Sequence, residues 1–230
     1  MSRKVFAEFL GSLLLAALVI GSGIAAQRLS DDVGLRLLEN AAATAAGLYV
    51  LILVFGPVSG AHFNPVVSIV DAAFGGLTWR AVAAYVPAQV AGCVSGAVLA
   101  NAMFDLAPVS ISTTHRATAA HGLSEVVATL GLVLVIFALV RSGRSAMAPA
   151  AVGAYIGAAY WFTSSTSFAN PAITVGRTFS DTFAGIAPAS VLPFVMAQLA
   201  GAAVAVLVLR VLYPLAAPDR RPDPEAAPIP

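Results

Sequence analysis

Charged residues are scarce in this 230-residue chain: 10% of its residues are Asp, Glu, Lys or Arg, against 59% that are hydrophobic. A soluble domain carries roughly 25% charged residues because its surface must be wetted. Mean hydropathy is +0.90, as expected where lipid surrounds the protein. The composition therefore excludes an ordinary soluble domain and predicts a membrane protein that crosses the bilayer several times.

Cysteine is almost absent, and positive charge shows no excess. The sole cysteine, Cys93, lies in an apolar run, which excludes a disulfide framework and a metal cage built from cysteines. Net charge is +1, so no basic face indicates nucleic-acid binding. His115, Arg116 and His121 share one long connection, and three such residues do not make a metal site. The sequence predicts neither a metal nor a cofactor.

Uncharged stretches mark the predicted membrane spans, because a spanning helix needs about 20 mostly uncharged residues. Six such intervals are present: 9–27, 40–70, 81–104, 126–140, 145–176 and 182–209. With their edges extended to an interfacial charge, they predict helices near 5–26, 38–57, 81–102, 124–141, 147–165 and 188–211. The second and fifth intervals each exceed one span by about ten turn-rich residues, and irregular backbone at membrane depth must be buried in protein or line a cavity. These extra pieces are the predicted pore elements.

The two halves of the chain repeat one another. The sequence SGAHFNPV at 59–66 is echoed by SFANPA at 167–172, and AQVAG at 88–92 by AQLAG at 197–201. The motif around Glu8 corresponds more loosely to the one around Glu125. These recurrences predict two units of three spans each. A second unit of three spans enters from the opposite face, so the repeat is inverted and the substrate path lies at the bilayer midplane.

The predicted units have defined limits and a preferred orientation. The first repeat covers 1–110, the second 111–215, and 216–230 is predicted to be a disordered tail with five prolines in fifteen residues.

Placing the N-terminus in the cytoplasm puts these arginines and lysine inside: Arg3, Lys4, Arg80, Arg141, Arg144, Arg210, Arg220 and Arg221. Four arginines remain outside: Arg28, Arg36, Arg116 and Arg177. The positive-inside rule therefore predicts both termini on the cytoplasmic side of the inner cell membrane. A cleaved signal peptide is the alternative for the N-terminal segment, but Glu8 interrupts its apolar run.

Two Asn-Pro motifs, Asn64-Pro65 and Asn170-Pro171, are the central site prediction. Asn is a favoured helix N-cap and Pro a favoured first helical residue, so each motif is expected to start a short helix. A single copy would be an ordinary capped turn, whereas two copies in an inverted repeat bring two positive helix ends together at the midplane. That arrangement repels cations, and the asparagine amides can donate hydrogen bonds to a neutral solute.

With these motifs in place, residues 3–212 resemble the aquaporin or major intrinsic protein family, on SGAHFNP at 59–65 and NPA at 170–172. The resemblance implies an all-α membrane protein with six transmembrane helices and two re-entrant half-helices. It also implies one pore per subunit, a homotetramer, and passive conduction of water, glycerol or similar neutral solutes. His62 resembles the family's inner-mouth histidine, for which a hydrogen-bonded lining role is favoured over a pH gate.

The chain departs from the family at the outer filter, where Ile173 replaces the usual arginine. Counting without gaps puts the other filter positions on Thr44, Ala158 and Ser167. Small residues and an aliphatic predict a wider, less charged filter that is not selective for water alone. The expected solutes are polyols, urea or metalloid hydroxides such as arsenous acid, because similar filters resemble those of family members linked to arsenic resistance.

Arg177 is a second departure, seven residues after Asn170. In a helix it would share a face with Ile173 and could replace the missing arginine at the outer mouth. The favoured alternative is an interfacial arginine that extends to water and pairs with Asp181.

Two other functional classes compete with a channel. A secondary transporter needs ionisable groups within its spans, and only Glu8 and Glu125 occur there, where each is expected to accept loop N–H groups. An intramembrane enzyme would need a catalytic cluster that the spans do not offer.

Overall fold

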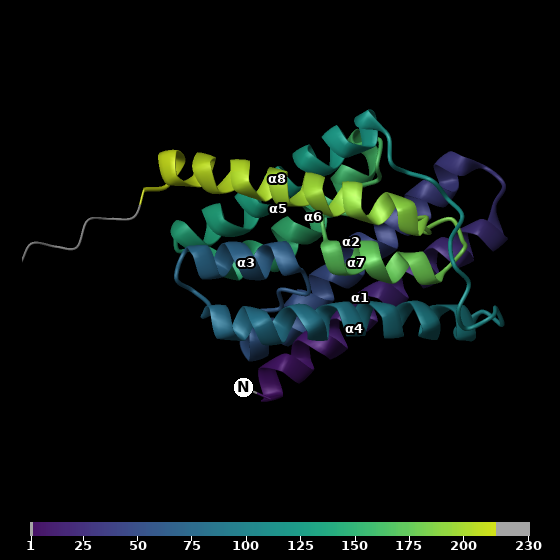
Figure 1. Cartoon of the computed structure of the whole chain (residues 1–230), viewed down its shortest axis with the longest axis horizontal. Helices are drawn as coiled ribbons and strands as arrows, with labels where there is room; N and C mark the ends of the chain where they lie inside the picture. Colours follow the sequence, from purple (N-terminus) through teal and green to yellow (C-terminus); the bar gives the residue numbers. More distant parts are fainter. Residues whose placement is uncertain (1, 215–230) are drawn as a thin grey trace, which may run out of the picture.

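The computed structural model describes residues 2–214, so the predicted Pro-rich tail at 216–230 lies outside the described residues. Its regular elements are helices throughout this range (Figure 1). In chain order they are α1 (Ser2–Leu29), α2 (Val33–Ser59), α3 (Pro65–Ala73), α4 (Trp79–Met103), α5 (Ala119–Arg141), η1 (Ser145–Met147), α6 (Ala148–Phe162), α7 (Pro171–Gly176), η2 (Arg177–Phe179) and α8 (Pro188–Leu212). Six long helices and two short ones match the predicted architecture.

The helices pack in a pattern that repeats between the halves. Helix α1 packs on α2 and α4, as α5 packs on α6 and α8. Each short helix contacts the last long helix of both halves, and α2 packs directly on α6. In Figure 1, α3 and α7 lie in one row between α8 and α4. The fold confirms the predicted inverted 3+3 repeat with two half-helices.

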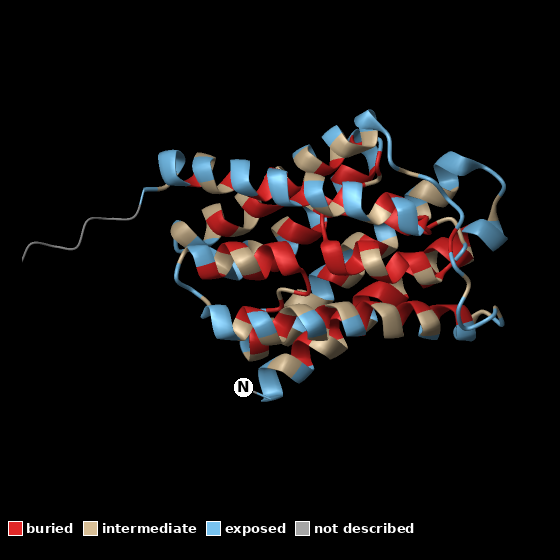
Figure 2. Ribbon diagram, viewed as in Figure 1, coloured by how far each residue is buried: buried red, intermediate tan, exposed pale blue. Residues whose placement is uncertain are grey.

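Small residues allow the long helices to approach closely. A Cβ added to Gly92 or Gly96 on α4 would collide with backbone carbonyls of α1, and one added to Gly201 on α8 would collide with a carbonyl of α5. Packing is therefore the role of these glycines. Figure 2 shows buried residues where helices face one another and exposed residues along the outer faces of α4 and α8.

Several predicted boundaries differ from the structure, the largest at the starts of α2 and α5, which lie five residues earlier than the expected 38 and 124. Helix α2, expected to end near 57, continues through Pro57 to Ser59 and is capped by Gly60, which is left-handed with φ of 93°. Helix α6 has 15 residues and ends at Phe162, short of the expected residue 165. Five helices of the described range are long and apolar enough to span a membrane by length and composition, and α6, at roughly 1.5 Å per residue, covers a shorter path.

Candidate functional site

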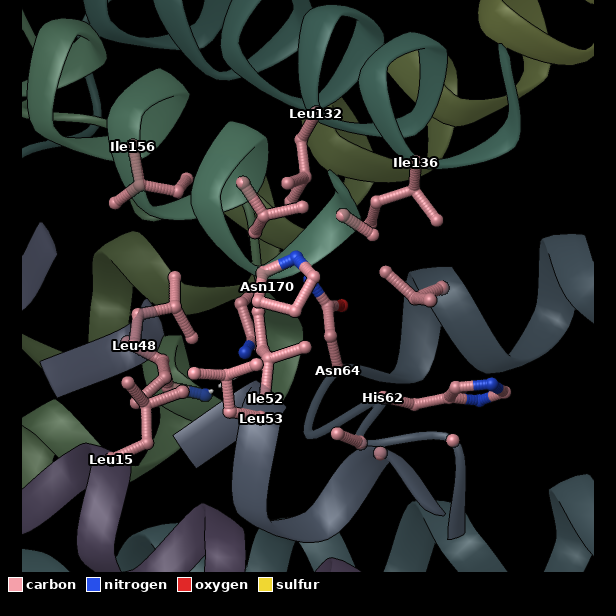
Figure 3. Close-up of a pocket in the computed structure, with 18 of the residues that line it drawn as sticks. Leu15, Leu48, Ile52, Leu53, His62, Asn64, Leu132, Ile136, Ile156 and Asn170 are labelled. Atoms are coloured by element: carbon pink, nitrogen blue, oxygen red, sulfur yellow. Dashed lines mark hydrogen bonds between the residues drawn. The ribbon is translucent and has the colours of Figure 1, made fainter. Parts of the chain in front are cut away.

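A cavity of about 660 Å³ contains the meeting point of the two half-helices. Asn64 and Asn170 both line it, and Figure 3 shows them at its centre, surrounded by apolar side chains that include Leu132, Ile136 and Ile156. Lining residues come from both repeats and include Ser145, which follows α5, and Arg177, which follows α7. The cavity lies between the helices of both repeats, and most of its wall is apolar.

Each Asn-Pro motif starts a half-helix as predicted. The Asn64 side chain accepts from the Val66 N–H at 3.0 Å, and the Asn170 side chain accepts from Ala172 at 2.9 Å. Pro65 and Pro171 are the first residues of α3 and α7 and are both buried. The asparagine caps accept N–H groups that would otherwise lack a partner at the helix start, and proline at the first position has no N–H to satisfy.

The two asparagines also join the two loops. Asn64 Nδ2 donates to the Ala169 carbonyl and Asn170 Nδ2 to the Phe63 carbonyl, each at 2.8 Å. Each amide carries a second N–H, which no residue within 2–214 accepts. Because both residues line the cavity, these hydrogens are available to a solute, beside two helix N-termini that carry positive potential.

The loops before the motifs are strained and are held by two buried carboxylates. Phe63, Ser167 and Ala169 have φ of 49°, 51° and 45°, a conformation that costs about 1–3 kcal/mol per residue outside glycine. Glu8 accepts the N–H groups of His62 and Phe63 at 3.0 and 2.7 Å.

Glu125 does the same in the second repeat, where it accepts from Phe168 and Ala169 at 2.9 Å each. Gln89 and Gln198 add interhelical bonds to Glu8 and Glu125 at 2.8 and 2.7 Å. The predicted anchoring of the loops by these carboxylates is confirmed.

His62 lines the cavity on the side of α3 and makes several contacts there. Its Nδ1 lies 3.0 Å from Ser68 Oγ, and its Nε2 lies 3.6 Å from an oxygen of Asp71, which also lines the cavity. The ring packs edge-on against Tyr85, with centroids 5.7 Å apart. These contacts fit a hydrogen-bonded lining residue.

Three of the four predicted filter residues, Thr44, Ser167 and Ile173, line the cavity and are buried. Ala158 does not, because it is exposed on the outer face of α6. Assigning Ala158 to the filter was therefore wrong, since counting without gaps ignored which face of α6 meets α2.

Five α6 residues line the cavity: Ala148, Pro149, Val152, Ile156 and Tyr160. The last three are four residues apart on one helix face. Tyr160 is the lining residue near Thr44 that sequence reasoning missed. Its hydroxyl lies 3.2 Å from Thr44 Oγ1. The four-residue spacing of these bulky side chains could have indicated this face.

Arg177 is not the interfacial arginine that the sequence favoured. Its side chain is 2% exposed, and it lines the cavity. Asp181, the expected partner, instead accepts from the Thr113 N–H at 2.9 Å. The prediction of an Arg177–Asp181 pair was wrong, because η2 packs on α4 and α7 and buries Arg177, while Asp181 binds Thr113.

A second arginine, Arg116, lies nearby in the long outer connection. Its Nε donates to the Gly185 carbonyl at 2.8 Å, and its guanidinium lies 5.4 Å from the centroid of the Phe168 ring. Burial lowers the pKa of Arg116 from its ordinary value, but an arginine remains protonated near neutral pH. Arg116 lies outside the cavity lining, and its bonds to the Phe183 and Gly185 carbonyls hold the connection before α8.

Comparison with known proteins fits this site. A family model for the major intrinsic protein family matches residues 1–168. The chain is 51% identical over 229 residues to aquaglyceroporin AqpS of Rhizobium meliloti (strain 1021), covering 99% of this chain and 98% of that protein. It is 33% identical to aquaporin NIP1-3 of Oryza sativa subsp. japonica, over 76% of this chain and 63% of the relative.

The fold is similar to the X-ray structure of the aquaglyceroporin from Plasmodium falciparum, with a TM-score of 0.72 and 21% identity, covering 92% of this chain and 96% of that one. Sequence motifs, inverted repeat, paired asparagine caps and these likenesses agree. The chain therefore belongs to the major intrinsic protein family.

Proposed function

We propose that this chain, a passive channel for small neutral solutes, conducts glycerol and other small polyols as well as water. The observation that carries the proposal is the two-sided wall of the cavity. Asn64, Asn170 and the Thr44–Tyr160 pair supply hydrogen-bonding groups, whereas Ile173, Leu48 and their neighbours supply apolar surface. A polyol has both a carbon skeleton and hydroxyl groups, so it matches both faces of such a wall.

Urea and metalloid hydroxides such as arsenous acid belong to the same proposal. Both are small, neutral and able to hydrogen-bond. Because Ile173 occupies the usual filter position, no arginine there favours water over these solutes. The name of the Rhizobium meliloti relative, an aquaglyceroporin, supports a solute range beyond water.

The transporter alternative is not supported. Ion coupling needs ionisable groups that can take up and release an ion within the spans. Glu8 and Glu125 are 0% exposed and are occupied by loop N–H groups and glutamine amides. Neither carboxylate is free to act as a coupling group. We also propose that the chain is a channel without enzymatic activity.

The remaining expectations are part of the proposal. The chain assembles as a homotetramer in the inner cell membrane, with one pore per subunit and both termini cytoplasmic. The repeats divide at 1–110 and 111–215, and the filter contains Thr44, Ser167 and Ile173. Support comes from the arginine distribution, the paired motifs and the cavity lining.

A panel of solutes tests the proposed range. Liposomes that contain the purified protein are mixed with hyperosmotic solutions of glycerol, urea or arsenous acid, or of an impermeant sugar to measure water flux alone. Vesicle volume is followed by stopped-flow light scattering. Shrinkage followed by fast reswelling is expected for glycerol and for at least one of the other solutes. Fast water flux with no solute entry above empty liposomes would contradict the proposal.

A further inference from the structure

Arg177 is a buried cation without a carboxylate partner. It is 2% exposed, and the ion pairs found in the described part of the chain, Arg36–Asp31 and His62–Asp71, do not include it. Burying a charge without a partner is costly, and arginine does not escape the cost by losing its proton. A cation buried at such a cost in the cavity wall points to a functional role.

Two groups fix the direction of the Arg177 side chain. Its Nε donates to the Ala184 carbonyl, and its guanidinium carbon lies 3.4 Å from the centroid of the Phe168 ring. Phe168 is itself anchored, since Glu125 accepts its N–H at 2.9 Å and its ring packs on Phe194 at 5.1 Å. The cation is therefore held by a carbonyl and a ring face, an arrangement that stabilises a guanidinium without neutralising it.

The remaining nitrogens of Arg177 are available to the pore. Nε is the only guanidinium atom for which an acceptor is found among residues 2–214, and an arginine has N–H donors on all three nitrogens. Arg177 lines the same cavity as Asn170 and Ile173. It follows Ile173 by four residues, which places it about one helical turn farther from the asparagines.

Opposing polar groups lie in the same cavity wall. Tyr160 and Thr44 bring two hydroxyls 3.2 Å apart from α6 and α2. Ser167, also in the lining, has a buried hydroxyl for which no partner is found within the described range. Donors and acceptors are thus present on several sides of the space that Arg177 borders.

We infer that Arg177 is the cation barrier and the principal solute-binding donor of the outer pore, taking over from η2 the role that Ile173 cannot fill. Its ligands are neutral solutes whose hydroxyl or carbonyl oxygens accept from the guanidinium. Cations and protons meet an uncompensated positive charge in a medium of low dielectric constant, where it acts strongly. This inference rests on the proposed channel function.

Two substitutions separate the charge from the donor geometry. Arg177→Gln keeps an N–H donor and removes the charge, whereas Arg177→Lys keeps the charge and loses the planar fork. Arg28→Ala is the matched control, because Arg28 also lies over an aromatic ring, 5.1 Å from the centroid of Phe104, but is exposed and outside the cavity lining.

The readouts are glycerol permeability by stopped-flow light scattering and proton entry into dye-loaded liposomes under an imposed membrane potential. Arg177→Gln is expected to raise proton entry by at least about tenfold, the effect of losing a unit charge in a low-dielectric pore. Arg177→Lys is expected to keep protons out while glycerol permeability falls severalfold. Arg28→Ala is expected to match the wild type in both measurements.

The outcomes distinguish this inference from the channel proposal. If the wild type passes no glycerol, the proposed function fails. If the wild type passes glycerol and Arg177→Gln excludes protons equally well, the inference alone is overturned. Should Arg177→Gln fail to fold, unchanged glycerol permeability in Arg177→Lys would overturn the role of the guanidinium as solute donor.

Discussion

Tyr160 and Ala158 lie on different faces of α6, and this difference decides which of them lines the cavity. Tyr160 is 3% exposed and lines the cavity, whereas Ala158 is exposed. The sequence identified the asparagines because their capping chemistry is local. It could not place Tyr160, because the face that α6 turns to the pore depends on its packing against α2 and α5.

Replacing Tyr160 by Ala should widen the outer pore. The change removes a ring from the cavity wall, so a four-carbon polyol such as erythritol should gain permeability relative to glycerol by about tenfold, as expected for steric discrimination of this size. Stopped-flow reswelling with the two solutes gives the ratio. Ala158→Leu is the control, and a large change in that variant would contradict the placement of α6.

Glu125 holds the loop before Asn170 by accepting two of its backbone N–H groups. Glu125→Gln replaces one acceptor oxygen by an NH₂ group that faces the donors of Phe168, Ala169 or Gln198. Losing a hydrogen bond to a charged acceptor costs about 1.5–3 kcal/mol. Thermal unfolding in detergent should therefore show a lower Tm than the wild type. Asp105→Asn, at an exposed loop position, should leave Tm unchanged, and equal Tm in all three proteins would refute the anchoring role.

The helices pair through glycines whose positions repeat between the halves. Gly92 on α4 faces a carbonyl of α1, and Gly201 on α8 faces one of α5. These contacts explain why the AQVAG and AQLAG motifs were detectable in the sequence. Helix ends were predicted less well: α2 was expected near 38–57, yet it runs from Val33 to Ser59 with Pro57 inside it, since tertiary packing outweighs local preference.

A pair of alanine substitutions tests helix packing at this scale. Gly92→Ala should lower the free energy of unfolding by about 1–3 kcal/mol, because the new methyl group overpacks the α1–α4 contact. Gly122→Ala should raise it by roughly 0.5–1 kcal/mol, because no atom lies within 4 Å of a Cβ there and alanine is the better helix former. Chemical denaturation in mixed micelles measures both. Equal effects from the two variants would contradict the packing scheme.

At the scale of the whole molecule, the sequence predicted the inverted repeat from short motifs alone. The orientation in the membrane depends on the arginine distribution and needs an experiment. Cys93, the sole cysteine, is buried, so a single added cysteine reports its own side of the membrane.

We expect Ser142→Cys, between α5 and η1, to be labelled by a membrane-impermeant thiol reagent only after cells are opened. Asp105→Cys, at the end of α4, should be labelled in intact cells. Labelling in the reverse order would place both termini outside. The wild-type chain, with Cys93 alone, serves as the unlabelled control.

The central claim is that this molecule is a passive channel for neutral, hydroxylated solutes. Glycerol flux into liposomes, measured over a wide range of glycerol concentration with and without proton and sodium gradients, tests it most directly. A linear dependence that ignores both gradients is the predicted result. Flux that saturates and follows an ion gradient would contradict the claim.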